Sequence, residues 1–497
     1  MKRSRARRLS SGTDSWDLIV VGAGSAGLPC AISAGQRGAQ VVVVEKAAQI
    51  GGTLLRAGGK LSAAGTRRQR TRGIDDSPER HFEDVMKLTQ GSADPDLVRV
   101  AVQEAPHTVD WLDDLGFPFD PLTPMVASSH EAYSVPRVYW GPGPVTRPYL
   151  ARTILETIRP LWDSLVAAGT ITPLLRHRLV GIVQDDRAVT GVRVRSAGGD
   201  EVVLSAPSVV LTSGGYASNP DLFAELTPGG PRPVSVAHET STGDGLLAAL
   251  EVGARLRNTE AYHPGCGAVE GIPGSLRAEP EFIKLAAMVR APREIHVNAH
   301  GERFRSEDEP SSDSLGPAVM RQPRQRMWLI FDDIALGTGD SVHMTWDAQE
   351  IRRRARDGAG IRTSDTLDGL AVLAGIDPGG LNATVAEWNH AVRTGYDRVG
   401  RTSPQHPVAS PPFYAIEMQL CVGHSPGGLA VDADLRVLDQ GGSPIPNLYA
   451  AGEILGSVAT MGNTSVGGML VTPALSFGRI LGRRLAPRTA ALEAAPR

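Results

Sequence analysis

Short apolar runs alternate with a segment of helical character in the first fifty residues. The run DLIVV at residues 17–21 is rich in aliphatic and β-branched residues, which predicts a strand buried on both faces. LPCAISAGQRGA at residues 28–39 predicts a helix that ends near Gly38. AQVVVVEK at residues 39–46 predicts a second buried strand with Glu45 at its end. The order strand, helix, strand predicts a βαβ unit at the start of an α/β fold.

Three glycines in the spacing GxGxxG join the first predicted strand to the helix. They are Gly22, Gly24 and Gly27. In a βαβ unit the first permits a tight turn, the second lets the backbone approach a pyrophosphate, and the third lets helix and strand pack closely. Glu45, 21 residues after Gly24, can accept hydrogen bonds from ribose hydroxyls. The pattern predicts a dinucleotide site, and the alternative is a glycine-rich turn in an ordinary α/β domain.

A second glycine-rich segment follows the second predicted strand. Residues 51–65 contain five glycines, where an NAD domain would normally continue with an amphipathic helix. Such a wrap is typical of flavoproteins, in which the backbone passes close to the isoalloxazine ring. Residues 208–220 predict another buried strand that runs into Gly214, but the rest of a GxGxxG motif is missing there. We therefore expect FAD, and no separate NAD(P)H domain.

The next hundred residues predict helices and one long loop. The patterns at residues 81–90 and 97–116 are helical, and residues 117–145 are rich in proline and aromatic residues. Loops of that length are usually functional or disordered.

Composition narrows the class of protein further. A chain of 497 residues predicts two or three domains, and a net charge of -3 does not favour nucleic-acid binding. Cys30, Cys266 and Cys421 lie far apart without a CxxC motif, so we expect no metal site and no redox-active disulfide. This cysteine pattern favours the cytoplasm. The chain contains no run of eighteen apolar residues, so we expect no membrane span.

Both ends of the chain are expected to be tails. Residues 1–13 are basic but lack the apolar stretch of a signal peptide, so we expect a disordered tail and no secretory or twin-arginine signal. Residues 488–497 predict a frayed C-terminal tail.

With these pieces the chain resembles the fumarate reductase and 3-ketosteroid dehydrogenase superfamily of FAD-dependent oxidoreductases. The resemblance extends over about residues 17–485. It rests on the first glycine motif with the segments that follow it, and on RLVGIVQDDRAVTGVRV, VVLTSGGYASN, TSTGDGLLAALEVGARL, YHPG, VNAHGERF and LYAAGEILGSVATMGNTSVGGMLVTPALSFG. The resemblance implies an α/β fold with a Rossmann-like, discontinuous FAD-binding domain and an inserted α+β cap.

The resemblance also implies domain limits. The FAD-binding domain is expected at residues 14–264, with a helical and loop insertion at 66–149, and again at 411–487, and the cap is expected at 265–410.

The family further implies the residues that hold a non-covalent FAD. No histidine stands near residues 54–62, where the His-linked members carry theirs. In the family, LYAAGE approaches the ribityl chain, and the glycine-rich loop and helix that follow present N–H groups to the pyrimidine end of the flavin, where the helix dipole favours negative charge. The expected FAD-binding residues are Gly22, Gly24, Ser25, Ala26, Gly27, Glu45, Lys46, Gly52, Thr53, Gly58, Gly59, Val180, Gly214, Gly452, Glu453, Gly468, Met469 and Leu470.

Members of this superfamily move a hydride between the flavin and a carbon near an activating carbonyl, while a protein acid or base handles the proton. Fumarate reductases carry an arginine before the last Gly-Gly pair, and ketosteroid dehydrogenases carry a tyrosine in a comparable loop. Here Ser465 stands at that place, which argues against a dicarboxylate substrate. We expect a dehydrogenase that introduces a C=C bond next to the ketone of a neutral cyclic or steroid-like molecule, with an external electron acceptor.

The candidate catalytic residues follow from the same resemblance. Tyr133 or Tyr139, with His424, would handle the proton, and Gly468 would donate to the enolate oxygen. The full set is Tyr133, Tyr139, Tyr262, Arg290, His424, Ser465 and Gly468. Structural roles are the alternative for the histidine, arginine and tyrosine candidates. Reduction of an enone or unsaturated acid, oxidation with O₂, and a non-catalytic flavin protein remain open as functions.

Overall fold

The computed structural model describes residues 16–127, 130–143, 150–227, 234–261, 264–269, 285, 287, 291–310, 313–337, 346–358, 360–402 and 404–487. The helices are α1 (Gly27–Gly35), α2 (Arg67–Thr71), α3 (Pro78–Leu88), α4 (Pro95–Asp114), α5 (Arg152–Ala167), α6 (Pro220–Leu226), α7 (Asp244–Glu251), α8 (Leu315–Met320), α9 (Asp333–Gly337), α10 (Ala348–Asp357), α11 (Leu367–Ala374), α12 (Pro378–Thr394), α13 (Val458–Met461) and α14 (Val471–Leu485), with short 3-10 helices η1 (Gly52–Leu55), η2 (Pro323–Gln325) and η3 (Glu453–Leu455).

The strands are β1 (Leu18–Val21), β2 (Val41–Glu45), β3 (Leu61–Ser62), β4 (Val138–Tyr139), β5 (Ile171–Leu175), β6 (His177–Asp185), β7 (Ala188–Ser196), β8 (Glu201–Ser205), β9 (Val209–Leu211), β10 (Val234–Ser235), β11 (Leu256–Arg257), β12 (Gly265–Val269), β13 (Ile295–Val297), β14 (Arg326–Asp332), β15 (Ile361–Ser364), β16 (Phe413–Val422), β17 (Gly428–Leu429), β18 (Arg436–Leu438) and β19 (Pro444–Ala450).

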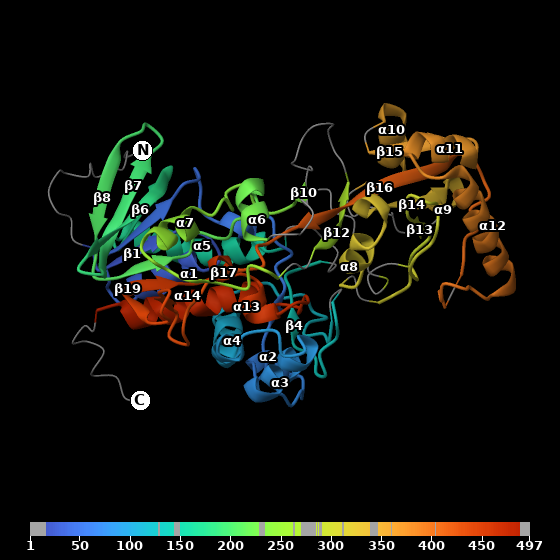
Figure 1. The fold of residues 1–497 in the computed structure, drawn as a ribbon. Helices are drawn as coiled ribbons and strands as arrows, with labels where there is room; N and C mark the ends of the chain where they lie inside the picture. Colours follow the sequence, from blue (N-terminus) through green and yellow to red (C-terminus); the bar gives the residue numbers. More distant parts are fainter. Residues whose placement is uncertain are drawn as a thin grey trace, which may run out of the picture.

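A six-stranded sheet forms the centre of the large lobe, which we define as the described residues at 16–261 and 423–487. Its strand order is β18-β19-β9-β1-β2-β5, and only β18 runs antiparallel to its neighbour. Helices α1 and α14 lie on one side of this sheet and the three-stranded sheet β6–β8 lies on the other (Figure 1). The predicted α/β fold class is confirmed, as are the strands at β1, β2 and β9 and the helices at α1, α3 and α4.

The parallel strands of the large sheet end at one common edge. Val21 at the end of β1 pairs with Val44 and with Leu211, and Leu211 also pairs with Ala450. Because the carboxyl ends of parallel strands meet at the same edge, the segments that follow them lie close together there. Glycines lie in these segments, at Gly22, Gly214 and Gly452.

A second sheet forms the small lobe, which we define as the described residues at 264–422. Strand β16 pairs with β10, β12, β14 and β15, and β13 adds to the edge of β14. Met327, Leu329 and Phe331 belong to one apolar cluster, and Trp328 and Ile330 belong to another. Because side chains alternate across a strand, both faces of this sheet are buried. Helices α8, α9 and α10 contribute to the first cluster, and α11 and α12 contribute to the second.

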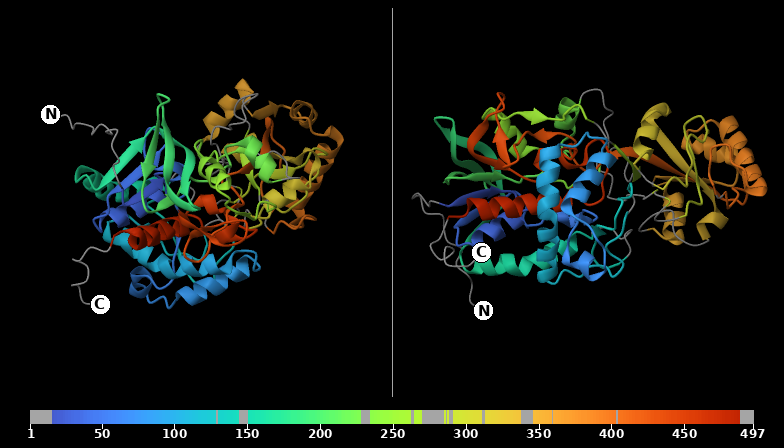
Figure 2. Two further views of the ribbon diagram at one scale, coloured as in Figure 1. Left: turned by 60° about the vertical axis from the view of Figure 1, so that its left-hand side comes forward. Right: turned by 90° about the horizontal axis from the view of Figure 1, so that it is seen from below.

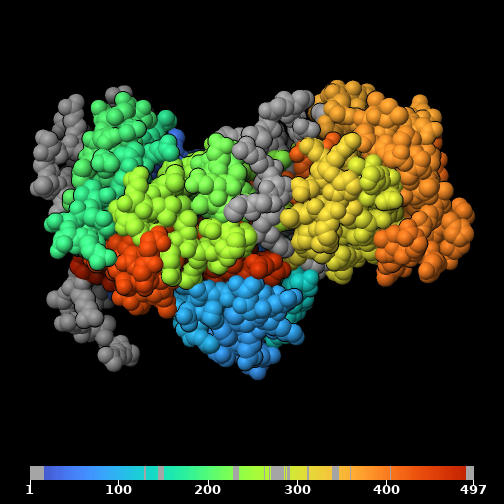
Figure 3. All heavy atoms as spheres, viewed as in Figure 1, coloured from blue at the N-terminus to red at the C-terminus, as the bar shows by residue number. Residues whose placement is uncertain are grey.

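The two lobes are joined through strands β12 and β16. Strand β16 runs from the large lobe far into the small lobe (Figures 1 and 2), and its C-terminal end pairs with β10. The space-filling view shows the yellow and orange residues of the small lobe as a separate body beside the green and red of the large lobe (Figure 3). The exact domain limits, and the tails at 1–13 and 488–497, remain predictions. Among the described helices, none combines the length and the apolar character that crossing a bilayer requires.

Candidate functional site

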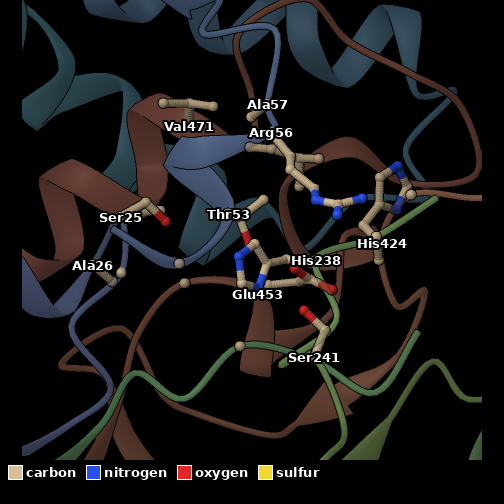
Figure 4. A pocket seen from close by; sticks show the side chains of 18 of the residues that line it. Ser25, Ala26, Thr53, Arg56, Ala57, His238, Ser241, His424, Glu453 and Val471 are labelled. Carbon is tan, nitrogen blue, oxygen red and sulfur yellow. The ribbon is translucent and has the colours of Figure 1, made fainter. Parts of the chain in front are cut away.

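A cavity of about 720 Å³ lies at the carboxyl edge of the large sheet and extends to the small lobe. Residues after β1, β2, β9 and β19 line one part of it. Cys266, Leu285 and Cys421 line the other part. Figure 4 shows Ser25 and Ala26 of the first glycine motif on one side and His424 on the opposite side. A cavity of this size and position is typical of a ligand site in an α/β protein.

The first glycine motif serves both packing and ligand approach. Gly22 has a φ of +106°, and a Cβ there would lie 2.5 Å from the backbone oxygen of Thr212. A Cβ on Gly27 would lie 1.8 Å from the oxygen of Gly22, so Gly27 is required by protein packing and does not line the cavity. A Cβ on Gly24 would meet no protein atom within 4 Å. Gly24 lines the cavity, so its bare backbone leaves space for a ligand.

Glu45 is held rigidly at the cavity wall. Its Oε2 accepts a hydrogen bond of 2.9 Å from the N–H of Ala23, and its Oε1 accepts one of 2.8 Å from Ala47. A carboxylate oxygen can accept more than one hydrogen bond, so Glu45 retains acceptor capacity for ribose hydroxyls. The predicted position of Glu45 at the end of β2 therefore agrees with the geometry that a ribose requires.

The positive charge of Lys46 is neutralised inside the protein. Its Nζ lies 2.8 Å from Oδ2 of Asp244 and donates to Thr242 Oγ1 at 2.6 Å. Arg178 pairs with the other oxygen of Asp244 at 2.7 Å. Burial raises the pKa of Asp244, but the two cations and their hydrogen bonds outweigh it, so the pKa lies below its ordinary value. Lys46 lines the cavity as part of this pair.

Glu453 approaches the cavity from the segment after β19. Its Oε1 accepts hydrogen bonds from the backbone N–H of Ser425 at 3.0 Å and from the Ser425 hydroxyl at 3.3 Å. Burial raises the pKa of Glu453. A Cβ on Gly215 would lie 2.5 Å from Glu453 Oε1, which explains a glycine at that position. Glu453 is thus held where a ribityl hydroxyl could donate to it.

The glycine-rich loop after β19 approaches protein backbone as well as ligand space. Gly468 has a φ of +83°, and its Cβ would lie 2.4 Å from the backbone nitrogen of Ser62. In α14, a Cβ on Gly478 would lie 2.1 Å from the carbonyl oxygen of Ala26, just before α1, and a Cβ on Gly482 would lie 2.1 Å from that of Cys30 in α1. We predicted close approach to a flavin; the structure shows that helix packing also requires several of these glycines.

Fifteen of the eighteen expected FAD-binding residues line the cavity, and three do not. Gly27 packs α1 against the first turn, as described above. Val180 does not line the cavity, because side chains alternate along β6 and the neighbouring Leu179 faces it instead. Met469 is buried under the loop, and its carbonyl oxygen accepts a hydrogen bond from Thr460. Contact of these three residues with the cofactor remains a prediction.

The structure brings only some of the candidate catalytic residues together. His424, Ser465 and Gly468 line the cavity. Tyr133 and Tyr139 do not line it, and their role as acid or base remains a prediction. Their hydroxyls are already engaged elsewhere: Tyr133 donates to the carbonyl of Gly467 at 2.8 Å, and Tyr139 bonds to Thr66 at 2.7 Å. The predicted residues Tyr262 and Arg290 lie outside the described residues.

Arg56 is a cavity residue that the sequence analysis missed. It lies in the second glycine-rich segment, and Figure 4 shows its side chain directed toward His424. Within the described ranges, no hydrogen bond or ion pair of Arg56 to another side chain is present. Burial and, next, the charge of Arg56 lower the pKa of His238, another missed cavity residue. The sequence feature that could have indicated a cavity position for Arg56 is its place two residues before Gly58.

The described cavity contains no group of three or more potential metal ligands. The charged residues that line the cavity are the carboxylates Glu45, Asp244, Asp313 and Glu453 and the cations Lys46, Arg56 and Lys60. These features fit a dinucleotide with a ring system rather than a metal ion.

Comparison with known proteins agrees with this geometry. The family model described as FAD binding domain matches residues 17–470. A probable fumarate reductase, Ifc3, of Shewanella frigidimarina is 30% identical over 502 residues, which cover 97% of this chain and 79% of the relative. A 4-oxocyclohexanecarboxylate 2-dehydrogenase of Sinomonas cyclohexanicum is 27% identical and covers 96% of this chain and 93% of the relative.

One solved structure shows the same fold with a different sequence. It is a 3-ketosteroid delta1-dehydrogenase from Sterolibacterium denitrificans in complex with 1,4-androstadiene-3,17-dione. The TM-score is 0.77 at 22% identity, covering 95% of this chain and 100% of that chain. The chain belongs to the FAD binding domain family, within the superfamily of fumarate reductases and 3-ketosteroid dehydrogenases. It is an oxidoreductase that uses FAD, and its cavity residues Gly24, Glu45 and Glu453 fit that cofactor.

Proposed function

We propose that the protein introduces a C=C bond next to the ketone of a small cyclic molecule. The observation that carries this proposal is the continuity of the cavity from Gly24 and Glu45 to His424 and Ser465. The far part of the cavity has apolar walls, including Leu285 and Val422. When bound, FAD supplies the acceptor for the hydride. The likeness to an enzyme named for a cyclic keto acid, 4-oxocyclohexanecarboxylate, supports a cyclic ketone as substrate.

The protein residues would activate the carbon that loses a proton. A hydrogen bond to the ketone oxygen acidifies the neighbouring C–H, because it stabilises the enolate that forms when the proton leaves. His424 is the described titratable residue that we assign to accept this proton, since its ring lies in the cavity opposite the first glycine motif (Figure 4). Ser465 lines the same cavity, and its hydroxyl can donate the hydrogen bond to the ketone oxygen.

Reduction of an unsaturated acid is a second candidate, and Arg56 is the observation that favours it. A guanidinium binds a carboxylate through paired, charge-assisted hydrogen bonds. Arg56 reaches toward His424, and among the described residues it is the arginine that lines the cavity, whereas Ser465 stands where fumarate reductases carry theirs. The likeness to a fumarate reductase supports this direction. The two candidates differ in the direction of hydride transfer and in the charge of the substrate.

An anaerobic titration of the FAD-loaded protein distinguishes the candidates. Saturated cyclic ketones, with and without a carboxylate, are added while the flavin absorption band is recorded. Bleaching supports the dehydrogenase. If no ketone bleaches the band, dithionite-reduced protein is mixed with cyclic enones and with fumarate. Return of the yellow colour with fumarate or an enone supports the reductase and contradicts the dehydrogenase. Reoxidation by air alone, at a comparable rate, would favour an oxidase.

Arg56→Gln separates neutral from anionic substrates in the same experiment. If a carboxylate contacts Arg56, the variant weakens binding of the keto acid or of fumarate about tenfold or more, while the neutral ketone is unaffected. Equal effects on both ketones would contradict a carboxylate contact. The physiological electron acceptor is proposed to be a separate molecule, and the cytoplasmic location remains a prediction.

A further inference from the structure

Two carbonyl groups of the glycine-rich loop accept hydrogen bonds from buried hydroxyls. The hydroxyl of Tyr133 donates to the carbonyl oxygen of Gly467 at 2.8 Å. The hydroxyl of Thr460 donates to the carbonyl oxygen of Met469 at 2.6 Å. Tyr133 is only 3% exposed and Thr460 only 5%, so water does not compete for these bonds.

The geometry of the peptide group fixes the direction of the N–H group that follows each of these two carbonyls. A trans peptide is planar, and its C=O and N–H groups point to opposite sides. The N–H of Gly468 therefore points away from Tyr133, and the N–H of Leu470 points away from Thr460. Gly468 and Leu470 line the cavity, whereas Gly467 and Met469 do not. The alternation places two N–H donors on the cavity side of the loop.

These two N–H groups remain available as donors. The loop N–H of Met469 donates to the carbonyl of Val466 at 3.1 Å. In the described part of the chain, by contrast, no protein acceptor is found for the N–H of Gly468 or of Leu470. A buried N–H group is rarely left unpaired in a protein. An acceptor supplied by a ligand in the cavity would satisfy both.

The surroundings prevent the loop from turning these groups away. The backbone of Gly468 lies against that of Ser62, where a Cβ would come within 2.4 Å. The N–H of Ser62 in turn donates to Thr472 in the first turn of α14 at 2.9 Å. The N-terminus of this fifteen-residue helix adds a partial positive charge at the same place.

Tyr133 is itself fixed and kept protonated. Its ring makes an edge contact with the ring of His81, with 5.3 Å between the two ring centroids. Its centroid also lies 5.2 Å from the guanidinium carbon of Arg137. Burial raises the pKa of Tyr133, so its hydroxyl stays a donor at any physiological pH. A phenol that stays protonated is suited to hold the carbonyl oxygen of Gly467.

We propose that Tyr133 and Thr460 are positioning residues that aim the N–H groups of Gly468 and Leu470 at an oxygen that gains negative charge during the reaction. Two oxygens have this chemistry. One is a carbonyl oxygen of the flavin pyrimidine ring, and the other is the ketone oxygen of the substrate as it becomes an enolate. Only the second depends on the function proposed above.

The test uses FAD-loaded Tyr133→Phe and Thr460→Val, with Tyr139→Phe as the matched control. Tyr139 is also a buried tyrosine with a bonded hydroxyl, but its partner is Thr66 and not the loop. The midpoint potential of bound FAD and its absorption spectrum are measured without substrate. If the N–H groups serve the flavin, each variant disfavours reduction about fivefold, the effect of one ordinary hydrogen bond, and Tyr139→Phe does not.

The turnover number distinguishes the ketone oxygen of the substrate from the carbonyl oxygen of the flavin as the acceptor. If the N–H groups serve the substrate, the potential stays at the wild-type value while kcat falls ten- to a hundredfold with little change in KM. Wild-type potential, spectrum and kcat in both variants would overturn the proposal. Thr460→Val provides the decision if Tyr133→Phe does not fold. Failure to find any ketone substrate would count against the proposed function and would leave the potential measurement intact.

Discussion

Two junctions, one at the cavity of the large lobe and one inside the small lobe, bring distant segments together by different means. In the large lobe the segments around the cavity pack backbone against backbone at glycines. Gly22 packs against Thr212 in this way, and Gly468 packs against Ser62. In the small lobe the corresponding junction is a buried network of charges. Arg303 donates to Glu307 at 2.8 Å.

The charged network links two segments of the small lobe that are far apart in the chain. Arg303 also bonds to Asp397 at 2.6 Å, and both Arg303 and Arg401 lie over the ring of Trp388, at 4.8 and 4.6 Å. The side chains of Arg303 and Asp397 are 3% and 1% exposed. Each charge is stable there only because its partners are present. The comparison teaches that glycine contacts bring the backbone segments around the cavity together, whereas at this junction of the small lobe ion pairs add to glycine contacts such as Gly301 against Leu381.

The largest effect is expected from removing one partner of the charged network. Arg303→Met should lower the free energy of unfolding by about 3–5 kcal/mol, because Glu307 and Asp397 would remain buried without a cation. Urea unfolding followed by circular dichroism measures this change. The flavin spectrum of the variant that remains folded should stay normal, since Arg303 does not line the cavity. A loss below 1 kcal/mol would show that these carboxylates are not held as the structure shows.

The glycine motif allows a matched pair of variants. Gly22→Ala should lower stability by about 2 kcal/mol and weaken FAD binding, because the new Cβ meets Thr212 at an unfavourable positive φ. Gly24→Ala should leave the apoprotein as stable as the wild type, since its Cβ meets only open space, and should weaken FAD binding about tenfold or more. Thermal unfolding of the apoprotein and FAD titration measure both. Normal FAD binding by Gly24→Ala would show that the cofactor does not pass there.

A pH dependence should distinguish two buried histidines. Burial and the charge of Arg137 lower the pKa of His81 well below its ordinary value, while burial lowers that of His296 against the opposing effect of Glu294. The folded protein keeps His81 neutral, but the unfolded chain takes up a proton below about pH 6.5. Stability should therefore fall as the pH drops below 6.5, by up to about 1.4 kcal/mol per pH unit from His81 alone.

The variant His81→Phe tests this assignment. Between about pH 6.5 and 5, the free energy of unfolding of His81→Phe should depend less steeply on pH than that of the wild type. His296→Phe should reduce this dependence by less. Urea unfolding at several pH values provides the measurement. An unchanged slope in His81→Phe would mean that this histidine is protonated in the folded state.

The smallest effect is expected on the surface of the small lobe. Arg353 bonds to Glu350 at 2.7 Å and to Asp357 at 2.7 Å, but it is half exposed. Exposed ion pairs add little, because solvent screens them and two long side chains must be ordered. Arg353→Ala should leave the urea midpoint unchanged within error. A shift as large as that of Arg303→Met would remove the contrast between buried and exposed arginines.

Local patterns explain why the fold and the cofactor edge could be predicted. The β-branched runs of β1 and β2 and the glycines between them constrain the backbone over about thirty residues, and such constraints are visible in any single sequence. Six of the fifteen expected FAD-binding residues that line the cavity lie in this stretch, and the other nine were expected from the family resemblance. On β6 the residue that lines the cavity is Leu179 and not Val180, because the sequence pattern did not reveal which face of this strand meets the cavity.

The catalytic face could not be predicted in the same way. Tyr133 and Arg56 lie in segments whose residue types suit either packing or chemistry, and their roles depend on which way each side chain turns. Tyr133 turns to Gly467, which is more than three hundred residues away in the chain, and Arg56 turns into the cavity.

The amino-acid order of this chain was sufficient for a βαβ start, a dinucleotide cavity and FAD, because short-range periodicity and glycine spacing encode backbone geometry directly. The partner of each polar side chain was settled in the folded molecule alone. Contacts such as Tyr133 with Gly467 and Arg303 with Asp397 form when segments far apart in the sequence pack together, and no local sequence pattern predicts such contacts.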